Sequence, residues 1–198
     1  MGSYAVTQYQ TIVSRNIAAQ DVAVLTVGAF NAGTDNNVIP SSAVVKLNLR
    51  WFNEKTRNIL LDGIKRINEG VATANGLSPD QYPVIKMKGH VFPLDNNVEL
   101  TNKVNTALGT VLEPKNIWTD RPSAMGSEDF HHLVLGNKKT VYNYIKVGIV
   151  DPGTYAKAIS EGKNAPFFHH SGNYKVELAG IPLGTTIAAM ALLEMFRK

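Results

Sequence analysis

Residues 54–75 form the stretch of the sequence that most constrains the fold. Apolar side chains recur there every three or four positions, in the order Leu60, Ile64, Ile67, Val71 and Ala74. This spacing gives an amphipathic helix with one apolar stripe. Gly76 follows at the position where glycine commonly ends a helix. It is the clearest helix in the chain.

Three elements before this helix and one after it complete a first group. The pattern predicts a helix over residues 4–17 and strands over 22–31, 43–52 and 83–92. In the second strand, Val45, Leu47, Leu49 and Trp51 alternate with polar positions that include Arg50. The order helix, strand, strand, helix, strand is that of a ferredoxin-like α+β sandwich without its first strand. We therefore expect a truncated N-terminus.

Residues 93–97, with a proline, an aspartate and two asparagines, read as a domain boundary. Beyond it we expect a helix starting at Val98, an irregular stretch over 116–125, and a short helix capped by Ser127. A buried strand is expected over 140–150, and a loop or short helix over 151–168. The last helix opens near Pro182 and runs to about Phe196.

Composition excludes several classes of protein. The net charge is +4, and the basic residues are scattered without aromatic residues between them, which argues against a nucleic-acid partner. No apolar run approaches the roughly 20 residues that span a bilayer, so no membrane partner is expected. The chain has no cysteine, which excludes disulfides and thiolate metal sites. We expect a cytoplasmic location, with periplasmic or secreted locations as open alternatives.

The histidines are the first candidates for chemistry. His169 and His170 stand in the stretch APFFHHSGNY at residues 165–174. An imidazole held against an apolar wall can bind a metal or transfer a proton, but a paired-histidine loop without function is an equal alternative. His90 is expected in a strand, as a surface or satisfied histidine rather than a ligand. His131 and His132 are expected on a short helix, facing solvent.

Two polar groups complete the candidates. Glu128 and Asp129 follow Gly126 at a helix start, where they could bind a cation or orient a catalytic group, but from the residues alone ordinary capping is the favoured interpretation. Arg50 on a strand and Asn37 on a long loop could together clamp a carboxylate, for which arginine is the preferred residue. The alternatives are a surface arginine and a plain turn.

Taken together, these segments resemble one family, the metal-dependent amidohydrolases that include hippurate hydrolase, plant auxin-conjugate hydrolases and N-acyl amino acid hydrolases. Carboxypeptidase G and aminoacylase are more distantly similar. The resemblance is carried by Arg50 and by these motifs: QTIVSRN at 10–16, VGAFNAG at 27–33, NVIP at 37–40, MGSEDF at 125–130, HSGNY at 170–174 and IPLG at 181–184.

The resemblance implies two domains and a set of site residues. Residues 1–93 would be most of a ferredoxin-like lid, or dimerisation, domain lacking its first strand. Residues 95–198 would be the C-terminal part of an α/β/α zinc-peptidase-like catalytic domain. His170 would bind metal, with Gly172 standing where the family usually has proline. The substrate-binding residues would be Asn37, Arg50, Gly126, Ser127 and Glu128.

The family's remaining metal ligands, its general base and a lid histidine lie in a segment that this sequence does not contain. The resemblance therefore implies a fragment of an enzyme that uses two divalent metal ions, zinc or manganese. The enzyme would hydrolyse the amide bond of N-acyl amino acids or small peptide-like substrates, as a homodimer joined through the lid. The isolated chain would be inactive and would not hold the metals stably. The alternative is a non-catalytic dimerisation or binding module derived from such an enzyme.

Overall fold

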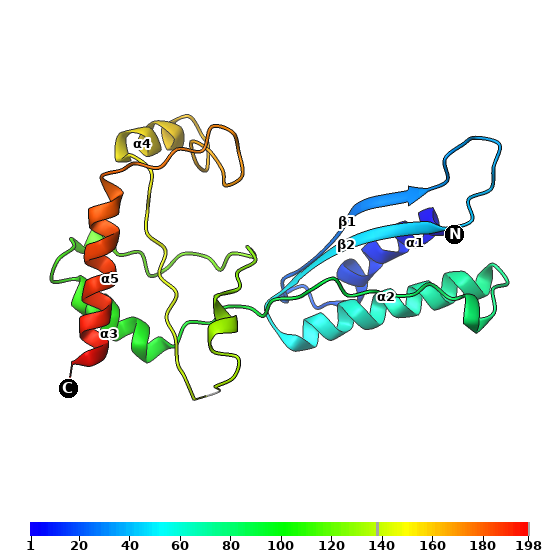
Figure 1. Cartoon of the computed structure of the whole chain (residues 1–198), viewed down its shortest axis with the longest axis horizontal. Coiled ribbons are helices and arrows are strands. Elements are labelled where there is room, and N and C mark those ends of the chain that lie inside the picture. The colour runs from blue at the N-terminus through cyan, green and yellow to red at the C-terminus, as the bar shows by residue number, and fades with distance from the viewer. Residues whose placement is uncertain (138, 198) are drawn as a thin grey trace. The chain divides into compact units, whose positions relative to one another are not determined.

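The computed structural model describes residues 1–137 and 139–197, which form two compact units. Unit 1 comprises Met1–Pro93 and Ser123–His131, and unit 2 comprises Leu94–Pro122 and His132–Lys198. The chain thus leaves unit 1 and returns to it once. The fold is a mixture of helices and strands with a small two-stranded sheet (Figure 1).

Unit 1 confirms four of the elements expected from its sequence. Helix α1 (Gly2–Thr11) continues into a π-helical turn, η1 (Ile12–Asn16). Strands β1 (Ala23–Ala32) and β2 (Ala43–Trp51) follow, and then helix α2 (Glu54–Ala74). A short 3₁₀ turn, η2, covers Pro79–Gln81. The Asn53 side chain caps α2 by accepting from the Thr56 N–H at 2.8 Å, and Gly76 ends it with φ +77°.

Strands β1 and β2 pair antiparallel across a long connection, but the register changes once. Leu25 lies opposite Leu49 and Val27 opposite Leu47, whereas Ala29 lies opposite Lys46. Gly28 is therefore the extra residue of a β-bulge, which exchanges the faces of β1 beyond it. As a result the Phe30 ring packs over Gly2 of α1, on the same side as Leu25.

The core of unit 1 joins α1, η1, α2 and one face of the sheet (Figure 1). Its buried members are Ala5, Tyr9, Ile12, Leu25, Leu60, Ile64, Ile67 and Val71. The apolar stripe of α2 supplies half of them, as its spacing predicts. Gly63 lets α2 approach η1, because a Cβ there would lie 2.9 Å from three side-chain atoms of Ile12.

The strand expected over residues 83–92 is wrong. The segment runs extended, but no described segment pairs with it in a ladder, and Val84, Ile85 and Met87 are exposed. Alternation of side chains is a local property, whereas a strand also needs a partner to receive its backbone hydrogen bonds. His90 accordingly lies in an extended coil rather than in a strand.

Unit 2 is built on helices α3 (Val98–Leu108), α4 (Pro152–Ser160) and α5 (Gly180–Phe196), with the short turn η3 (Pro114–Asn116). The predicted helices near Val98 and Pro182 are confirmed, and α4 settles the choice over residues 151–168 for a short helix. Its core lies between α3 and α5 and consists of Val104, Leu108, Ile187 and Ala191.

The buried strand expected over residues 140–150 is also wrong. The Asn96 side chain pairs with the backbone of Tyr144, at 2.8 Å and 3.0 Å, and the Asn97 N–H donates to the Tyr142 carbonyl at 3.1 Å. These contacts fix one end of the segment without forming a ladder. Val141 and Ile145 are exposed.

Across the described residues, no helix combines the length and the apolar character that crossing a membrane would require.

Candidate functional site

Arg50 lies on the polar face of β2 and is held by two neutral acceptors. Its Nε–H donates to Asn48 Oδ1 at 3.2 Å, two residues away on the same face of the strand. Its Nη1 donates to the backbone carbonyl of Met125, which belongs to the second segment of unit 1. The fold therefore brings Arg50 to the loop of residues 125–128, two features that the sequence singled out separately.

The charge of Arg50 has no acidic partner within the described part of the chain. The ion pairs there involve Arg57, Arg197 and four lysines, and each of them is exposed or partly exposed. Arg50 is half-buried, and its guanidinium has five N–H donors in a planar fork. Such a group suits a ligand carboxylate, since two of its donors can bind the two oxygens together.

The 125–128 loop presents Gly126 and Ser127 to solvent, while Glu128 is half-buried. A Cβ at Gly126 would meet nothing within 4 Å, so the loop leaves open space beside this residue. The short helix expected to start at Ser127 is wrong, because residues 127–129 are irregular and a 3₁₀ turn, η4 (Phe130–Leu133), begins later. Glu128 and Asp129 precede that turn rather than occupying its first positions.

His131 fastens the loop at its C-terminal end. The ring is 4% exposed, and its Nε2 accepts from the Phe92 N–H at 3.2 Å. The edge of one ring meets the face of the other, with 5.5 Å between the centroids of Phe92 and His131. The expectation that His131 faces solvent is therefore wrong, whereas His132 is exposed as expected. Sequence reasoning missed this contact because Phe92 and His131 lie 39 positions apart.

Asn37 does not join this site within one chain. It lies in a turn of the long connection between β1 and β2, which extends beyond the far end of the sheet (Figure 1). Arg50 pairs with Val24 near the other end, seven residues along β2 from Ala43. At the usual rise per strand residue this separates Ala43 and Arg50 by roughly 23 Å. One chain therefore cannot close Asn37 and Arg50 on the same small carboxylate.

His170 belongs to unit 2 and lies in an exposed turn. It has φ +65°, in the left-handed region that non-glycine residues rarely adopt. Ser171 fixes the turn, since its backbone N–H and its hydroxyl both donate to the Phe168 carbonyl. Tyr174 contacts the rings of Phe167 and His169, so His169 packs on an aromatic neighbour, and His170 beside it is exposed.

The described residues do not form a metal centre by themselves. Nowhere in residues 1–137 and 139–197 do three or more His, Asp or Glu side chains gather closely enough to hold an ion. A catalytic zinc normally takes three protein ligands. His170 alone does not meet that requirement.

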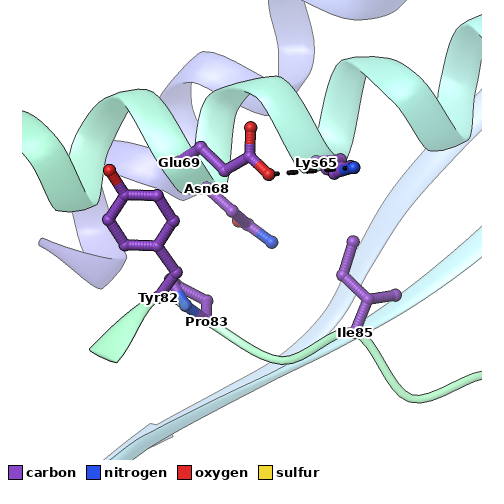
Figure 2. A pocket seen from close by; sticks show the side chains of 6 residues that line it. All are labelled: Lys65, Asn68, Glu69, Tyr82, Pro83 and Ile85. Carbon is purple, nitrogen blue, oxygen red and sulfur yellow. Dashed lines mark ion pairs between the residues drawn. The ribbon is translucent and has the colours of Figure 1, made fainter. Parts of the chain in front are cut away.

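A shallow hollow of about 240 Å³ lies on the flank of α2 (Figure 2). The Lys65–Glu69 ion pair runs along one side, with Tyr82, Pro83 and Ile85 opposite. Asn68 forms its floor and accepts from the Tyr9 hydroxyl at 2.5 Å. Burial raises the pKa of Tyr9 above its ordinary value. None of the residues that the sequence proposed for function lines this hollow.

Comparisons with known proteins bear on both units. The chain is 34% identical over 132 residues to an N-acetyldiaminopimelate deacetylase of Streptococcus thermophilus, covering 67% of this chain and 34% of that protein. It is 35% identical over 146 residues to the hippurate hydrolase of Campylobacter jejuni, covering 73% and 36%. A crystal structure assigned to an aminohydrolase of methicillin-resistant Staphylococcus aureus shares the fold, with a TM-score of 0.68 at 20% identity, over 100% of this chain and 46% of that one.

No protein-family model matches the chain. The relatives nevertheless define a class, because each of the two curated proteins is named as a hydrolase or a deacetylase. The chain belongs to the amidohydrolase family that contains hippurate hydrolase and N-acetyldiaminopimelate deacetylase. It spans about a third of the length of these relatives.

Proposed function

We propose that this chain is part of a metal-dependent amidohydrolase that hydrolyses the amide bond of N-acyl amino acids or small peptide-like substrates. The names of the relatives support this class of substrate, since hippurate and N-acetyldiaminopimelate are both acylated amino acids with a free carboxylate. The observation that carries the proposal is Arg50, a half-buried cation held by neutral groups beside the 125–128 loop.

Arg50 would bind the substrate carboxylate through the donors that Asn48 and Met125 leave available. The bond to the Met125 carbonyl orients the guanidinium plane, so that less side-chain freedom is lost when a ligand binds. Gly126, Ser127 and Glu128 would line the same site, with the open space beside Gly126 admitting part of the substrate. These residues bind and orient the substrate, and we assign no bond-breaking step to them.

Metal binding is a separate part of the proposal. His170 would contribute one ligand, and the other ligands and the general base would come from residues outside this sequence. The left-handed backbone at His170 supports this role, because strain of this kind is concentrated at functional sites. A single ligand does not hold a pair of metal ions, so the 198-residue chain on its own would be inactive.

A homodimer would reconcile Asn37 with the site. Within one chain, Asn37 lies beyond the end of the sheet opposite to Arg50. If both residues serve one substrate, the asparagine must come from a second copy. We therefore propose that the enzyme is a homodimer joined through unit 1, in which each copy offers Asn37 to the other.

Ligand binding to the intact chain tests the role of Arg50. Titration of hippurate into the wild-type chain, followed by calorimetry or NMR, should show binding that Arg50→Gln weakens about tenfold or more, as expected for a lost bidentate ion pair. Arg15→Gln is the matched control, because this substitution removes the same charge from an exposed arginine. Equal losses in the two variants would contradict the assignment of Arg50.

Enzymatic activity and oligomeric state test the proposed metal centre and homodimer. Purified chain supplied with Zn²⁺ or Mn²⁺ should release no benzoate from hippurate, and light scattering should show the dimer. Metal-dependent hydrolysis by this chain alone would contradict the incomplete metal centre. The second candidate, a non-catalytic dimerisation or binding module, is favoured by the lack of a three-ligand cluster among the described residues. Metal-dependent activity of a longer protein that contains this sequence would exclude it.

A further inference from the structure

The strongest unassigned feature is the contact that closes unit 1 around its second segment. His131 is almost fully buried, accepts from the Phe92 N–H at 3.2 Å, and packs edge to face on the Phe92 ring. The Phe92 ring in turn meets His90, with 5.2 Å between ring centroids. Phe92 lies at the end of the first segment of unit 1, and His131 is the last residue of its second segment. The contact therefore joins the C-terminal ends of the two segments.

The hydrogen bond joins two segments of irregular backbone. Residues 83–92 form no ladder with any described segment, and the 125–128 loop is irregular. The loop is attached to β2 where the Met125 carbonyl accepts from Arg50. His131 attaches the same segment to Phe92, six positions later. The stretch between Met125 and His131 is thus fixed at both ends.

We propose that His131 is a positioning residue, which holds the 125–131 segment on Phe92 so that the Met125 carbonyl stays in place to orient the Arg50 guanidinium. His131 acts through the backbone of this segment, between its own bond to Phe92 and the bond of the Met125 carbonyl to Arg50. The consequence for a bound carboxylate rests on the function proposed above, whereas the orientation of Arg50 does not.

The chemistry distinguishes this role from simple packing. An imidazole nitrogen that accepts from an amide N–H must carry a lone pair, so the ring is neutral with its hydrogen on Nδ1. Phenylalanine keeps a ring of similar size and apolar contact but cannot accept. Glutamine lacks the ring, but its side-chain oxygen lies near the position of Nε2 and can accept. If His131 acts by packing alone, His131→Phe should stay closer to the wild type than His131→Gln. If it acts by accepting the hydrogen bond, His131→Gln should stay closer to the wild type.

Two spectroscopic measurements on the intact chain test the proposal. Hydrogen exchange of the Phe92 amide should be about tenfold faster in His131→Phe, with protection partly recovered in His131→Gln. The Nε–H resonance of Arg50 should shift or broaden in His131→Phe and return toward the wild-type position in His131→Gln. His132→Gln is the control at the exposed neighbour and should change neither signal.

A ligand titration completes the test. Hippurate affinity should fall about five- to tenfold in His131→Phe and recover in His131→Gln. Unchanged Phe92 exchange, or faster exchange with an unmoved Arg50 resonance, would overturn the proposal. If wild-type chain binds no hippurate, the function proposed above fails, and the Arg50 resonance still decides the role of His131. If His131→Phe does not fold, the comparison of His131→Gln with wild type decides, since loss of Phe92 protection there overturns the proposal.

Discussion

The two units differ in how completely their helices are covered. In unit 1, α2 carries one apolar stripe, and α1, η1 and the sheet cover it. In unit 2, α5 is apolar on most sides, and α3 covers a narrow seam centred on Ile187 and Ala191. Met190 packs on this seam, whereas six other large apolar side chains of α5 are exposed: Ile181, Leu183, Leu192, Leu193, Met195 and Phe196. The stability of this chain should therefore reside mainly in unit 1.

The largest expected effect comes from opening a cavity in unit 1. Leu60 is fully buried in the core, so Leu60→Ala should lower the free energy of unfolding by about 2–5 kcal/mol. Leu108→Ala in unit 2 should cost less, because the seam between α3 and α5 is small and can close around the gap. Urea denaturation followed by circular dichroism measures both. Equal losses would show that the two cores are equally complete.

Overpacking in α2 sharpens the same comparison. A Cβ at Gly63 would lie 2.9 Å from three atoms of the buried Ile12 side chain, so Gly63→Ala should cost about 1–3 kcal/mol. Gly70 is the control in the same helix, because no atom lies within 4 Å of its Cβ position. Gly70→Ala should be neutral or stabilising by up to about 1 kcal/mol in thermal melts. A stabilised Gly63→Ala would mean that η1 does not press on α2.

Tyr9 gives the core of unit 1 a dependence on pH. Burial raises the pKa of Tyr9, so the folded state favours the neutral phenol. Its contribution to stability is present below the ordinary tyrosine pKa of roughly 10 and is lost as the pH rises through the higher folded value. Tyr9→Phe should cost about 0.5–1.5 kcal/mol at neutral pH through the bond to Asn68, and should reduce the loss above pH 10.

Denaturation curves at pH 7, 9 and 10.5 measure this effect. Tyr4→Phe serves as the control, since it removes the same hydroxyl group from an exposed side chain of α1. An unchanged alkaline slope in Tyr9→Phe would indicate that another group governs the loss.

The smallest effect concerns two matched helix caps. Asn53 caps α2 in unit 1 and Asn97 caps α3 in unit 2, each accepting the N–H three residues ahead, at 2.8 and 2.9 Å. Either alanine variant should cost about 1 kcal/mol, with serine restoring most of it. Because α3 has fewer tertiary contacts, Asn97→Ala should also speed amide exchange along α3, whereas α2 should remain protected in Asn53→Ala. The same pattern in both helices would weaken the contrast between the units.

The sequence predicts what depends on neighbours along the chain. The stripe from Leu60 to Val71, the alternation in β2 and the stop at Gly76 are all local, and the structure confirms them. The strands expected over 83–92 and 140–150 fail because a ladder needs a partner that alternation does not reveal. The expected exposure of His131 is wrong for the same reason, since its burial depends on the contact with Phe92.

The same difference between local patterns and long-range contacts applies to the candidate site. Sequence reasoning chose Arg50 and the 125–128 loop independently, and the structure brings them into contact. It paired Arg50 with Asn37, although the length of the hairpin separates them within one chain. Their roles in binding, and that of His170 toward metal, stay predictions that the titrations above address.

The bulge at Gly28 has a consequence for how β1 can vary. Before Gly28 the odd-numbered residues face the helices, and after it the even-numbered Phe30 does. The alternation of faces along β1 is therefore shifted by one residue at Gly28. Deleting Gly28 would leave these pairs unchanged, because Val27 opposite Leu47 would be followed directly by Ala29 opposite Lys46, and Phe30 would still face the helices. Straightening the strand with Gly28 retained would instead pair Gly28 with Lys46 and turn Phe30 to the other face of the sheet. A one-residue deletion should therefore be tolerated at Gly28, where it removes the bulge and moves no pair of the ladder.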